Sequence, residues 1–352
     1  MKAAALPSLC VRRKPAAKPQ VPTHGSTGVP MREGARGEAA MRDRFNSAWT
    51  GFKTWFWDSP ILLLALTAII WAGHSLVSRL AVGEIAPMTL TTARWGVALG
   101  PILFAARHTL WSDIAAMRKR WLFVTMMGVL GFTAFNALFY VAGHHTSALN
   151  LSIIQGVIPA LVLLGARFGL SEKVTALQAI GAVVTVLGVV AIASQGQWSR
   201  LAVLQFNGGD VVMLVACIFY SGYTVGLRNR PRTSGMGLLA AMAFVAFLTC
   251  LPLLGWEIAD GDFIWPTGKA WALIVYASLG VAFASQIFYM RGVELIGPGR
   301  AGVFVNLVPV FGALMAVVLL GEPFAFYHLA ALALVVGGIA VAQYGKPRPA
   351  AR

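Results

Sequence analysis

The sequence predicts an all-α polytopic membrane protein in which ten transmembrane helices form two inverted five-helix repeats. Three observations predict this fold class: an apolar composition, ten apolar runs as long as a membrane span, and an internal repeat of about 150 residues. Of the 352 residues, 58% are hydrophobic and 12% are charged, and the mean hydropathy is +0.72. Soluble domains are less apolar and more charged, so the chain is expected to be integral to a membrane.

The apolar runs between Pro60 and Tyr344 are each about 17–22 residues long, the length that a helix needs to cross a hydrocarbon core of about 30 Å. Helix is the expected state because the backbone polar groups must find hydrogen-bond partners within the segment. The predicted spans are residues 60–79, 88–106, 121–141, 148–167, 175–194, 210–227, 236–255, 270–290, 301–320 and 326–344.

Lys and Arg are spread unevenly over the predicted loops. With the N-terminus in the cytoplasm, the inner loops and both terminal segments hold most of them, whereas Arg79, Arg200 and Lys269 fall outside. Cytoplasmic loops of membrane proteins are enriched in Lys and Arg, so both termini are predicted to be cytoplasmic. We therefore attribute the formal net charge of +15 to topology and to contact with anionic membrane lipid, and we expect no nucleic acid partner.

The segment ahead of the first span divides in two. Residues 1–44 lack hydrophobic periodicity and are predicted to be a disordered basic tail without a signal peptide, with Met41 as an alternative start. Aromatic residues recur on one helical face of residues 45–59, which predicts a short amphipathic, interfacial segment or, equally, an ordinary aromatic belt. The remaining predicted segments are the first repeat (60–194), a linker (195–209), the second repeat (210–344) and a cytoplasmic tail (345–352).

A shift of about 150 residues brings the two halves of the chain into register. Each half holds five spans, and because five is odd, the second half must enter the membrane from the opposite side. Inverted repeats of this kind are a transporter architecture with a central site between the halves. The matched pairs are Trp71 with Tyr220, Gly73 with Gly222, Arg79 with Arg228, Tyr140 with Tyr289, Pro159 with Pro309, Glu172 with Glu322 and Gly188 with Gly338.

One pattern occurs in both halves: a span with a Pro in its middle ends at an acidic residue and leads into a span that contains Gly. It reads Ile158-Pro159-Ala160, Ser171-Glu172 and Gly188 in the first half, and Val308-Pro309-Val310, Gly321-Glu322 and Gly338 in the second. With Arg94-Trp95 in the second span, the chain resembles the EamA-type, ten-span branch of the drug/metabolite transporter superfamily over residues 60–344. Ser171 departs from this resemblance, since the family pattern has Gly there. The resemblance implies transport of a small metabolite, or its export across the bacterial inner (plasma) membrane.

Polar side chains at membrane depth are the candidate substrate-binding residues, because such groups are costly in lipid unless they face a cavity or a partner. Trp71 and His74 share a face of the first span, and Tyr220 and Tyr223 occupy the equivalent face of the sixth. We interpret these faces as a substrate pocket at the repeat interface; alternatively, they contribute only to helix packing. The predicted substrate-binding or pathway residues are Trp71, His74, Arg94, Asn136, Tyr140, Gln155, Tyr220, Tyr223, Gln286 and Asn306.

Two further features bear on mechanism. Arg94 lies deep in the second span and no Asp or Glu lies in any predicted span core, so Arg94 is either a structural anchor or a contact for an anionic group of the substrate. His74 is the only residue placed for a proton relay, and facilitated transport or exchange is the alternative to proton coupling. Pro159 and Pro309 each remove a helix hydrogen bond in mid-span and are predicted to act in gating.

Other functions find little support in the sequence. HExxH, GxSxG and P-loop motifs are absent, so we expect no enzyme. Cys10, Cys217 and Cys250 form no CxxC pair and His144-His145 is an unpromising chelator, so we expect no metal and no cofactor. The predicted function is a transporter, in the export direction, of a small metabolite such as an amino acid or a drug-like compound, working by alternating access. The alternative is a non-transport membrane interaction or assembly protein on the same scaffold, and the oligomeric state stays open.

Overall fold

The computed structural model describes residues 50–51, 53–171, 174–197 and 207–344. It holds two compact units, Met1–Lys53 and Thr54–Arg352. In the first unit, Thr50, Gly51 and Lys53 are helical. The predicted tails 1–44 and 345–352, most of the linker 195–209 and Glu172 lie outside the described residues. All helices named below belong to the second unit.

The first half of the second unit crosses the bundle five times. It consists of α2 (Pro60–Leu80), α3 (Pro87–Ala106), the short α4 (Leu110–Lys119), a third crossing made of α5 (Trp121–Gly128), the π-helix η1 (Val129–Ala134) and α6 (Phe135–His145), a fourth made of α7 (Ala148–Gln155) and α8 (Ile158–Gly169), and α9 (Ala176–Ala193).

The second half repeats this order. It consists of α11 (Gly208–Gly226) with the 3-10 turn η2 (Leu227–Asn229), α12 (Gly235–Asp260), a third crossing made of α13 (Gly268–Val275), the π-helix η3 (Tyr276–Ala284) and α14 (Ser285–Ile296), a fourth made of α15 (Pro298–Val305) and α16 (Val308–Leu320), and α17 (Phe326–Tyr344). A π-helix in the third crossing and a break in the fourth thus occur in both halves.

Local sequence signals explain several helix ends. α2 begins with Pro60 at its first position, where the missing N–H is no loss. The Thr175 side chain accepts a hydrogen bond from Gln178 N, and the Gln178 side chain accepts one from Thr175 N, which makes a capping box at α9. α12 runs on to Asp260, past the predicted end at 255, and stops where Gly261 adopts φ 85°.

Each of the ten predicted spans corresponds to a helix or to consecutive helical pieces. Within the described residues, nine helical segments have the length and hydropathy of a membrane span. α3 is the tenth crossing; three threonines and Arg94 lower its hydropathy. The seventh and eighth helices extend beyond their predicted ends, to Asp260 and Ile296. The fold is therefore all-α and polytopic, with five crossings in each half.

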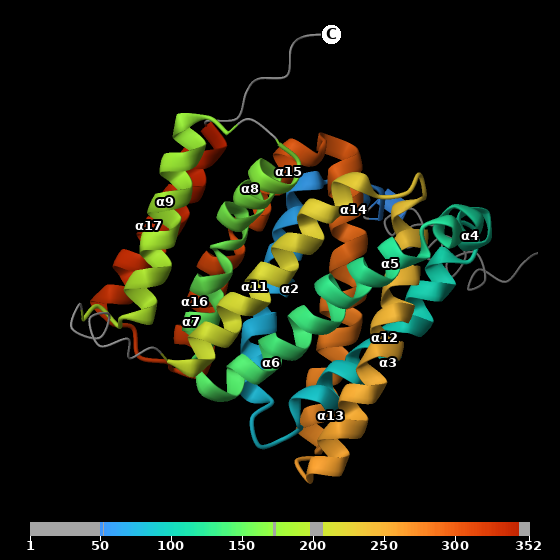
Figure 1. The fold of residues 1–352 in the computed structure, drawn as a ribbon, viewed down its shortest axis with the longest axis horizontal. Coiled ribbons are helices and arrows are strands. Elements are labelled where there is room, and N and C mark those ends of the chain that lie inside the picture. The colour runs from blue at the N-terminus through green and yellow to red at the C-terminus, as the bar shows by residue number, and fades with distance from the viewer. Residues whose placement is uncertain (1–49, 52, 172–173, 198–206, 345–352) are drawn as a thin grey trace, which may run out of the picture. The chain divides into compact units, whose positions relative to one another are not determined.

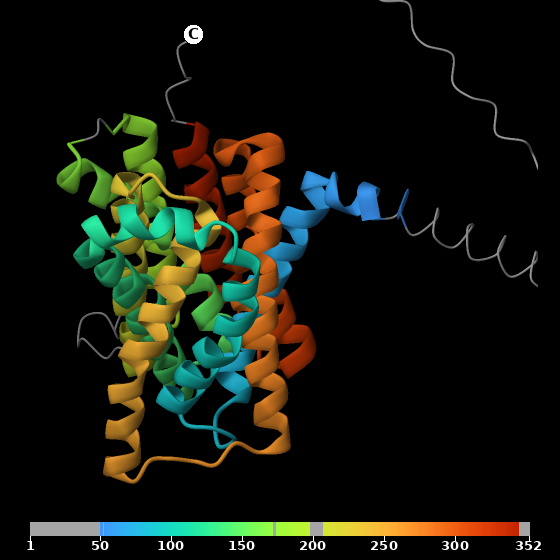
Figure 2. The same cartoon turned by 90° about the vertical axis from the view of Figure 1, so that its right-hand side faces the viewer.

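The two halves interleave rather than lie side by side. In Figure 1, α9 and α17 run together at one edge, α11 and α2 lie near the centre, and α3 and α12 lie at the other edge. Figure 2 shows the same bundle from the side, with α12 and the following crossing reaching furthest at one end. The most extensive packing joins helices from opposite halves: α9 with α17, α3 with α12, α11 with α6 and α8, and α2 with α14 and α16.

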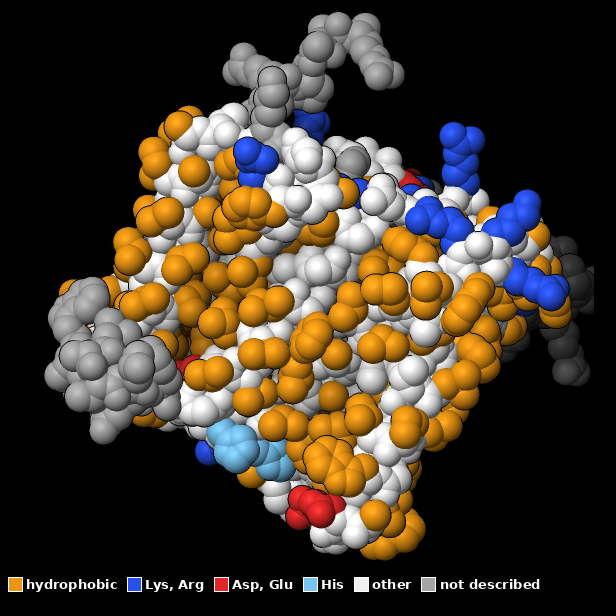
Figure 3. All heavy atoms as spheres, viewed as in Figure 1, with side chains coloured by type: hydrophobic (Ala, Val, Ile, Leu, Met, Phe, Trp, Pro, Cys, Tyr) orange, Lys and Arg blue, Asp and Glu red, His pale blue; other side chains and the backbone are white. Residues whose placement is uncertain are grey.

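Charged side chains mark the two ends of the bundle. Figure 3 shows a broad band of hydrophobic side chains, with most Lys and Arg toward one end and His and acidic side chains toward the other. The basic end carries Arg107, Arg118, Arg120, Arg228 and Arg230 at helix termini, and the acidic end carries Glu84, Asp210, Glu257 and Glu322. An apolar band between two polar ends is the surface expected of a chain that spans a bilayer.

Candidate functional site

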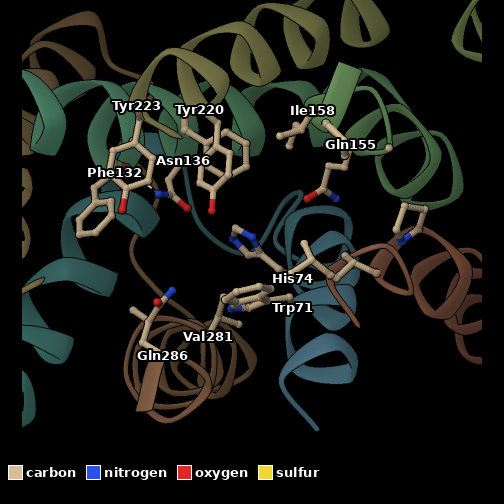
Figure 4. Close-up of a pocket in the computed structure, with 18 of the residues that line it drawn as sticks. Trp71, His74, Phe132, Asn136, Gln155, Ile158, Tyr220, Tyr223, Val281 and Gln286 are labelled. Atoms are coloured by element: carbon tan, nitrogen blue, oxygen red, sulfur yellow. Dashed lines mark hydrogen bonds between the residues drawn. The ribbon is translucent and has the colours of Figure 1, made fainter. Parts of the chain in front are cut away.

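A cavity of about 1030 Å³, including the space at its mouth, lies in the centre of the bundle. Its walls combine polar groups from the first half of the chain with aromatic and amide groups from both halves (Figure 4). Residues from α2, α3, η1, α6, α11, η3 and α14 line it, together with the breaks in the two fourth crossings. Ligand sites of transporters built from inverted repeats lie at this place, between the repeats and near the membrane midplane.

Arg94 is the charged group of this cavity, and its side chain is only 4% exposed. Its Nη1 donates to Nε2 of His74 at 2.8 Å, to Oη of Tyr140 at 3.2 Å and to Oδ1 of Asn136. Asn136 is held in place because its Nδ2 donates to the Phe132 carbonyl at 2.6 Å. The guanidinium therefore has three neutral acceptors, all on one of its nitrogens.

His74 is oriented from both sides. Its ring stacks on Phe139 with centroids 4.4 Å apart and lies edge-on to Tyr140. An arginine nitrogen can only donate, so Nε2 of His74 accepts the hydrogen bond from Arg94, and the proton of the neutral ring is on Nδ1. While this contact is held, a second proton on His74 would place two cations within hydrogen-bond distance of each other.

Aromatic rings form the apolar part of the cavity wall. Trp71 packs against Tyr289 at 5.4 Å, and its Nε1 donates to Oγ of Ser285 at 2.8 Å. Trp95 and Phe132 are stacked with centroids 4.6 Å apart. Tyr220 and Tyr223 contact each other at 5.5 Å on the opposite side, as Figure 4 shows. Such a wall suits a ligand with a flat apolar part.

Both broken crossings meet at this cavity. Pro159 and Pro309 each follow the first residue of the second helical piece, α8 or α16, where a proline needs no intrahelical donor. The prediction of a mid-span kink is thus refined to a break, with turns at Gly156-Val157 and Asn306-Leu307. A Cβ on Gly156 would lie 3.4 Å from Pro309, so the two breaks are close neighbours.

A second, connected cavity leads toward the basic end. It shares Trp71, Pro159, Tyr220 and other walls with the first, has a volume of about 1970 Å³ including open space, and extends to the exposed Arg228 and Arg230. Neither cavity has an Asp or Glu among its described lining residues. The path into the protein from this end is therefore basic.

At the acidic end, carboxylates tie the two halves together. Glu322 accepts hydrogen bonds from the backbone N–H groups of Ala148 and Leu149 at 2.9 and 2.8 Å, and so caps the start of α7. Glu257 accepts equivalent bonds from the first turn of α3. In the loops, hydrogen bonds from Thr267 and Lys269 hold the pKa of Glu84 below its usual value. These links join the two halves at the acidic end, whereas the second cavity extends to the basic end.

Comparison with known proteins identifies the family. A sequence model described as the EamA-like transporter family matches residues 58–194 and again residues 207–343, which together make up most of the chain. The chain belongs to the EamA-like transporter family. The resemblance drawn from the Pro, Glu and Gly pattern is thereby confirmed. As a member of a transporter family, the chain is a multi-pass membrane transporter and not an enzyme.

Relatives of this EamA-like transporter cover most of its length. It is 24% identical to the uncharacterized transporter YyaM of Bacillus subtilis (strain 168) over 293 residues, which are 80% of this chain and 92% of that protein. It is 25% identical over 291 residues to an S-adenosylmethionine/S-adenosylhomocysteine transporter of Chlamydia trachomatis, covering 76% of this chain and 84% of the relative. A crystal structure of another protein, 20% identical, matches with a TM-score of 0.56 over 80% of this chain and 95% of the other.

The structure brings most of the predicted pathway residues of this EamA-like transporter together. The residues that line one or both cavities are Trp71, His74, Arg94, Asn136, Gln155, Tyr220, Tyr223, Gln286, Asn306, Pro159 and Pro309. Tyr140 lines neither; it is 1% exposed and supports His74 and Arg94 from behind. Sequence reasoning did not single out Phe132 and Phe135, because an apolar aromatic in an apolar span carries no signal of its own. Their stacking partners could be found only in the folded bundle.

Proposed function

We propose that this EamA-like transporter exports a small metabolite, such as an amino acid or a drug-like compound, from the cytoplasm by alternating access. The observation that carries the proposal is the central cavity, where Arg94 and His74 from the first half face Tyr220 and Gln286 from the second. A polar pocket at the meeting point of two inverted repeats is what alternating access requires. The conformation, open at the basic end and linked at the acidic end, is the loading state of such an exporter.

The proposed location is the bacterial inner membrane, with both termini in the cytoplasm. Support comes from the gathering of Arg residues at one end of the bundle, because cytoplasmic ends are enriched in basic residues and lie against anionic lipid. A C-terminal fusion to green fluorescent protein should fluoresce, whereas a C-terminal fusion to alkaline phosphatase should be inactive. An active phosphatase fusion would reverse the proposed direction of transport.

Pro159 and Pro309 are proposed as gating elements. Each lies at a break in a crossing that lines the cavity, and a break lets one helical piece move without its partner. The two breaks are close neighbours, since a Cβ on Gly156 would lie 3.4 Å from Pro309, so bending at one changes the room available at the other. Replacing Pro159 with Ala is expected to lower the transport rate more than the binding affinity.

The substrate can be sought by ligand-dependent stabilisation. The screen of the purified protein covers amino acids, nucleosides, sugars and drugs, and includes S-adenosylmethionine and S-adenosylhomocysteine because the Chlamydia relative is named for them. A hit should be lost in Trp71→Ala, which removes a cavity wall, and kept in Trp111→Ala, a matched change at a side chain that is 77% exposed on α4. Exchange of the hit across proteoliposomes then tests transport directly.

The two functional alternatives give different results in this screen. A membrane assembly protein on the same scaffold has no small-molecule ligand, so no compound should raise its melting temperature through the cavity. Stabilisation that depends on Trp71, together with exchange across the bilayer, would establish transport. Stabilisation that persists in Trp71→Ala would place the ligand elsewhere and contradict the proposed site.

A further inference from the structure

The guanidinium of Arg94 is satisfied on one side only. All three of its hydrogen bonds leave from Nη1. Nε is buried without a partner, and none of the hydrogen bonds between Arg94 and other described residues involves Nη2. The edge formed by Nε and Nη2 is one of the edges with which arginine binds a carboxylate or phosphate through two parallel bonds. A purely structural anchor deep in a bundle would be expected to use these donors as well.

A second unused donor lies in the same cavity. Within the described residues, three buried side-chain atoms have no hydrogen-bond partner: Nε of Arg94, Nε1 of Trp95 and Oδ1 of Asn150. Both of the donors come from the neighbouring residues Arg94 and Trp95, and both residues line the cavity. Buried donors without acceptors are rare in native proteins and call for a missing acceptor.

The positive charge of Arg94 also lacks a counter-ion. Its described hydrogen-bond partners are His74, Asn136 and Tyr140, which are neutral in this arrangement. Buried carboxylates of the described residues have partners elsewhere. Glu257 and Glu322 cap helices at the acidic end, and Asp210 accepts hydrogen bonds from Thr146 and Asn150. A buried ion without an opposite charge is unfavourable, and an anion entering the cavity would remove that penalty.

The entrance to the cavity also favours a negatively charged ligand. The connected cavity reaches Arg228 and Arg230 and has no described acidic lining residue. A basic mouth with apolar walls concentrates anions and repels cations. The walls further in are the aromatic rings of Trp71, Phe132 and Tyr220, which accept a flat apolar group.

From these observations we infer that the substrate is a flat organic anion whose carboxylate or phosphate binds the Nε and Nη2 edge of Arg94, with its ring among the cavity aromatics. This inference rests on the proposed transport function and adds the charge and shape of the transported compound. Arg94 is then the residue that selects the substrate, and His74 and Asn136 are positioning residues that fix the guanidinium. An aromatic amino acid would present its carboxylate to Arg94 in the same way, but as a zwitterion it carries no net charge and is not the organic anion inferred here.

The test compares probes that differ in charge but share a ring. Indole-3-acetate, indole-3-acetamide and tryptamine are titrated against the full-length protein in lipid nanodiscs at neutral pH, with phenyl phosphate to distinguish phosphate from carboxylate. The anion is expected to bind about ten- to a hundredfold more tightly than the amide, because the amide forfeits the charge-assisted pair. Tryptamine is expected not to bind.

Variants locate the effect at Arg94. Arg94→Gln should remove the preference for the anion, whereas Arg107→Gln, which deletes an exposed arginine at the end of the same helix, should leave it unchanged. Arg94→Lys keeps the positive charge but lacks the two parallel N–H donors of the guanidinium, and should bind the anion with intermediate affinity. If the Arg94 variants do not fold, the comparison of the probes on the unaltered protein decides the question alone.

Several outcomes would overturn the inference. Three results would each show that Arg94 does not select for negative charge. They are equal affinity for indole-3-acetate and indole-3-acetamide, tighter binding of tryptamine than of indole-3-acetate, and an Arg94→Gln protein that still prefers indole-3-acetate. No measurable binding of either indole-3-acetate or phenyl phosphate would also contradict the inference, since the unused Nε and Nη2 edge of Arg94 beside these rings should bind them. A neutral or cationic compound that binds to the unaltered protein but not to Trp71→Ala would contradict the inferred negative charge of the substrate. It would leave the proposed transport function unaffected.

Discussion

Replacing Glu322 with Gln should loosen the link that holds the acidic end closed. The carboxylate accepts from the N–H groups of Ala148 and Leu149, which begin α7 and have no acceptor within that helix. Gln keeps one neutral acceptor and loses the charge, so one of the two charge-assisted hydrogen bonds is lost and the other becomes neutral. Such a bond contributes about 1.5–3 kcal/mol, which corresponds to a change of about ten- to a hundredfold in the equilibrium for opening.

Hydrogen exchange measures this opening at the amides themselves. In the Glu322→Gln protein, the amides of Ala148 and Leu149 should exchange about ten to a hundred times faster, because exchange follows the free energy of local opening. Asn150 supplies an internal reference, since its N–H donates to Oγ of Ser147 at 3.0 Å and not to Glu322. Mass spectrometry with fragmentation to single amides resolves these neighbours.

A matched variant separates this link from a general effect of losing charge. Glu294→Gln removes a carboxylate whose only ion pair with a described residue is with Arg291 at the surface, and exposed pairs of this kind contribute about 0–1 kcal/mol. Exchange at Ala148 and Leu149 should be unchanged in Glu294→Gln. Unchanged exchange in Glu322→Gln as well would refute the view that this carboxylate holds the acidic end.

Two further predictions concern backbone geometry. Ser171 adopts φ 53°, in the left-handed region that its counterpart Gly321 occupies with φ 66°. Because glycine adopts this conformation without strain, Ser171→Gly should stabilise the protein by about 1 kcal/mol and raise its melting temperature. A lower melting temperature would contradict the reasoning. Gly131→Ala would place a Cβ 2.4 Å from the ring of Tyr223, and should lower the free energy of unfolding by about 1–3 kcal/mol and reshape the cavity. Gly222→Ala is the control, since its Cβ would meet no atom within 4 Å, and it should leave the melting temperature unchanged.

The sequence could predict the spans and the repeat because both depend on local chemistry. A run of about 20 apolar residues has few alternatives to a membrane helix, whatever its neighbours are. Pro159 and Pro309 mark the breaks because a proline disturbs the backbone of its own helix. The polar pathway residues could also be found, since a His or an Arg within an apolar span needs a reason to be there.

What the sequence could not show depends on contacts between distant segments. Tyr140 is polar and at the right depth, yet it stands behind His74, and nothing in its own helix indicates this. The unused edge of Arg94 is likewise visible only when its three acceptors, from two other helices, are in place. The departure of Ser171 from the family pattern was visible in the sequence, but its left-handed backbone was not.

Interleaving of the halves limits how the protein can change conformation. α3 packs along α12 and α9 along α17, so neither five-helix repeat can rotate as a rigid body without breaking the largest helix contacts in the structure. Close approaches reinforce this, since a Cβ on Gly181 would lie 2.4 Å from the Gly338 carbonyl. We therefore expect conformational change to occur within helices, at places where the regular backbone hydrogen bonding is already interrupted. Those places are the breaks at Pro159 and Pro309 and the π-helices η1 and η3, and all four border the central cavity. A substrate held by Arg94, as proposed above, would lie in the cavity that these four places border, and its binding would then have a route to control which end is open.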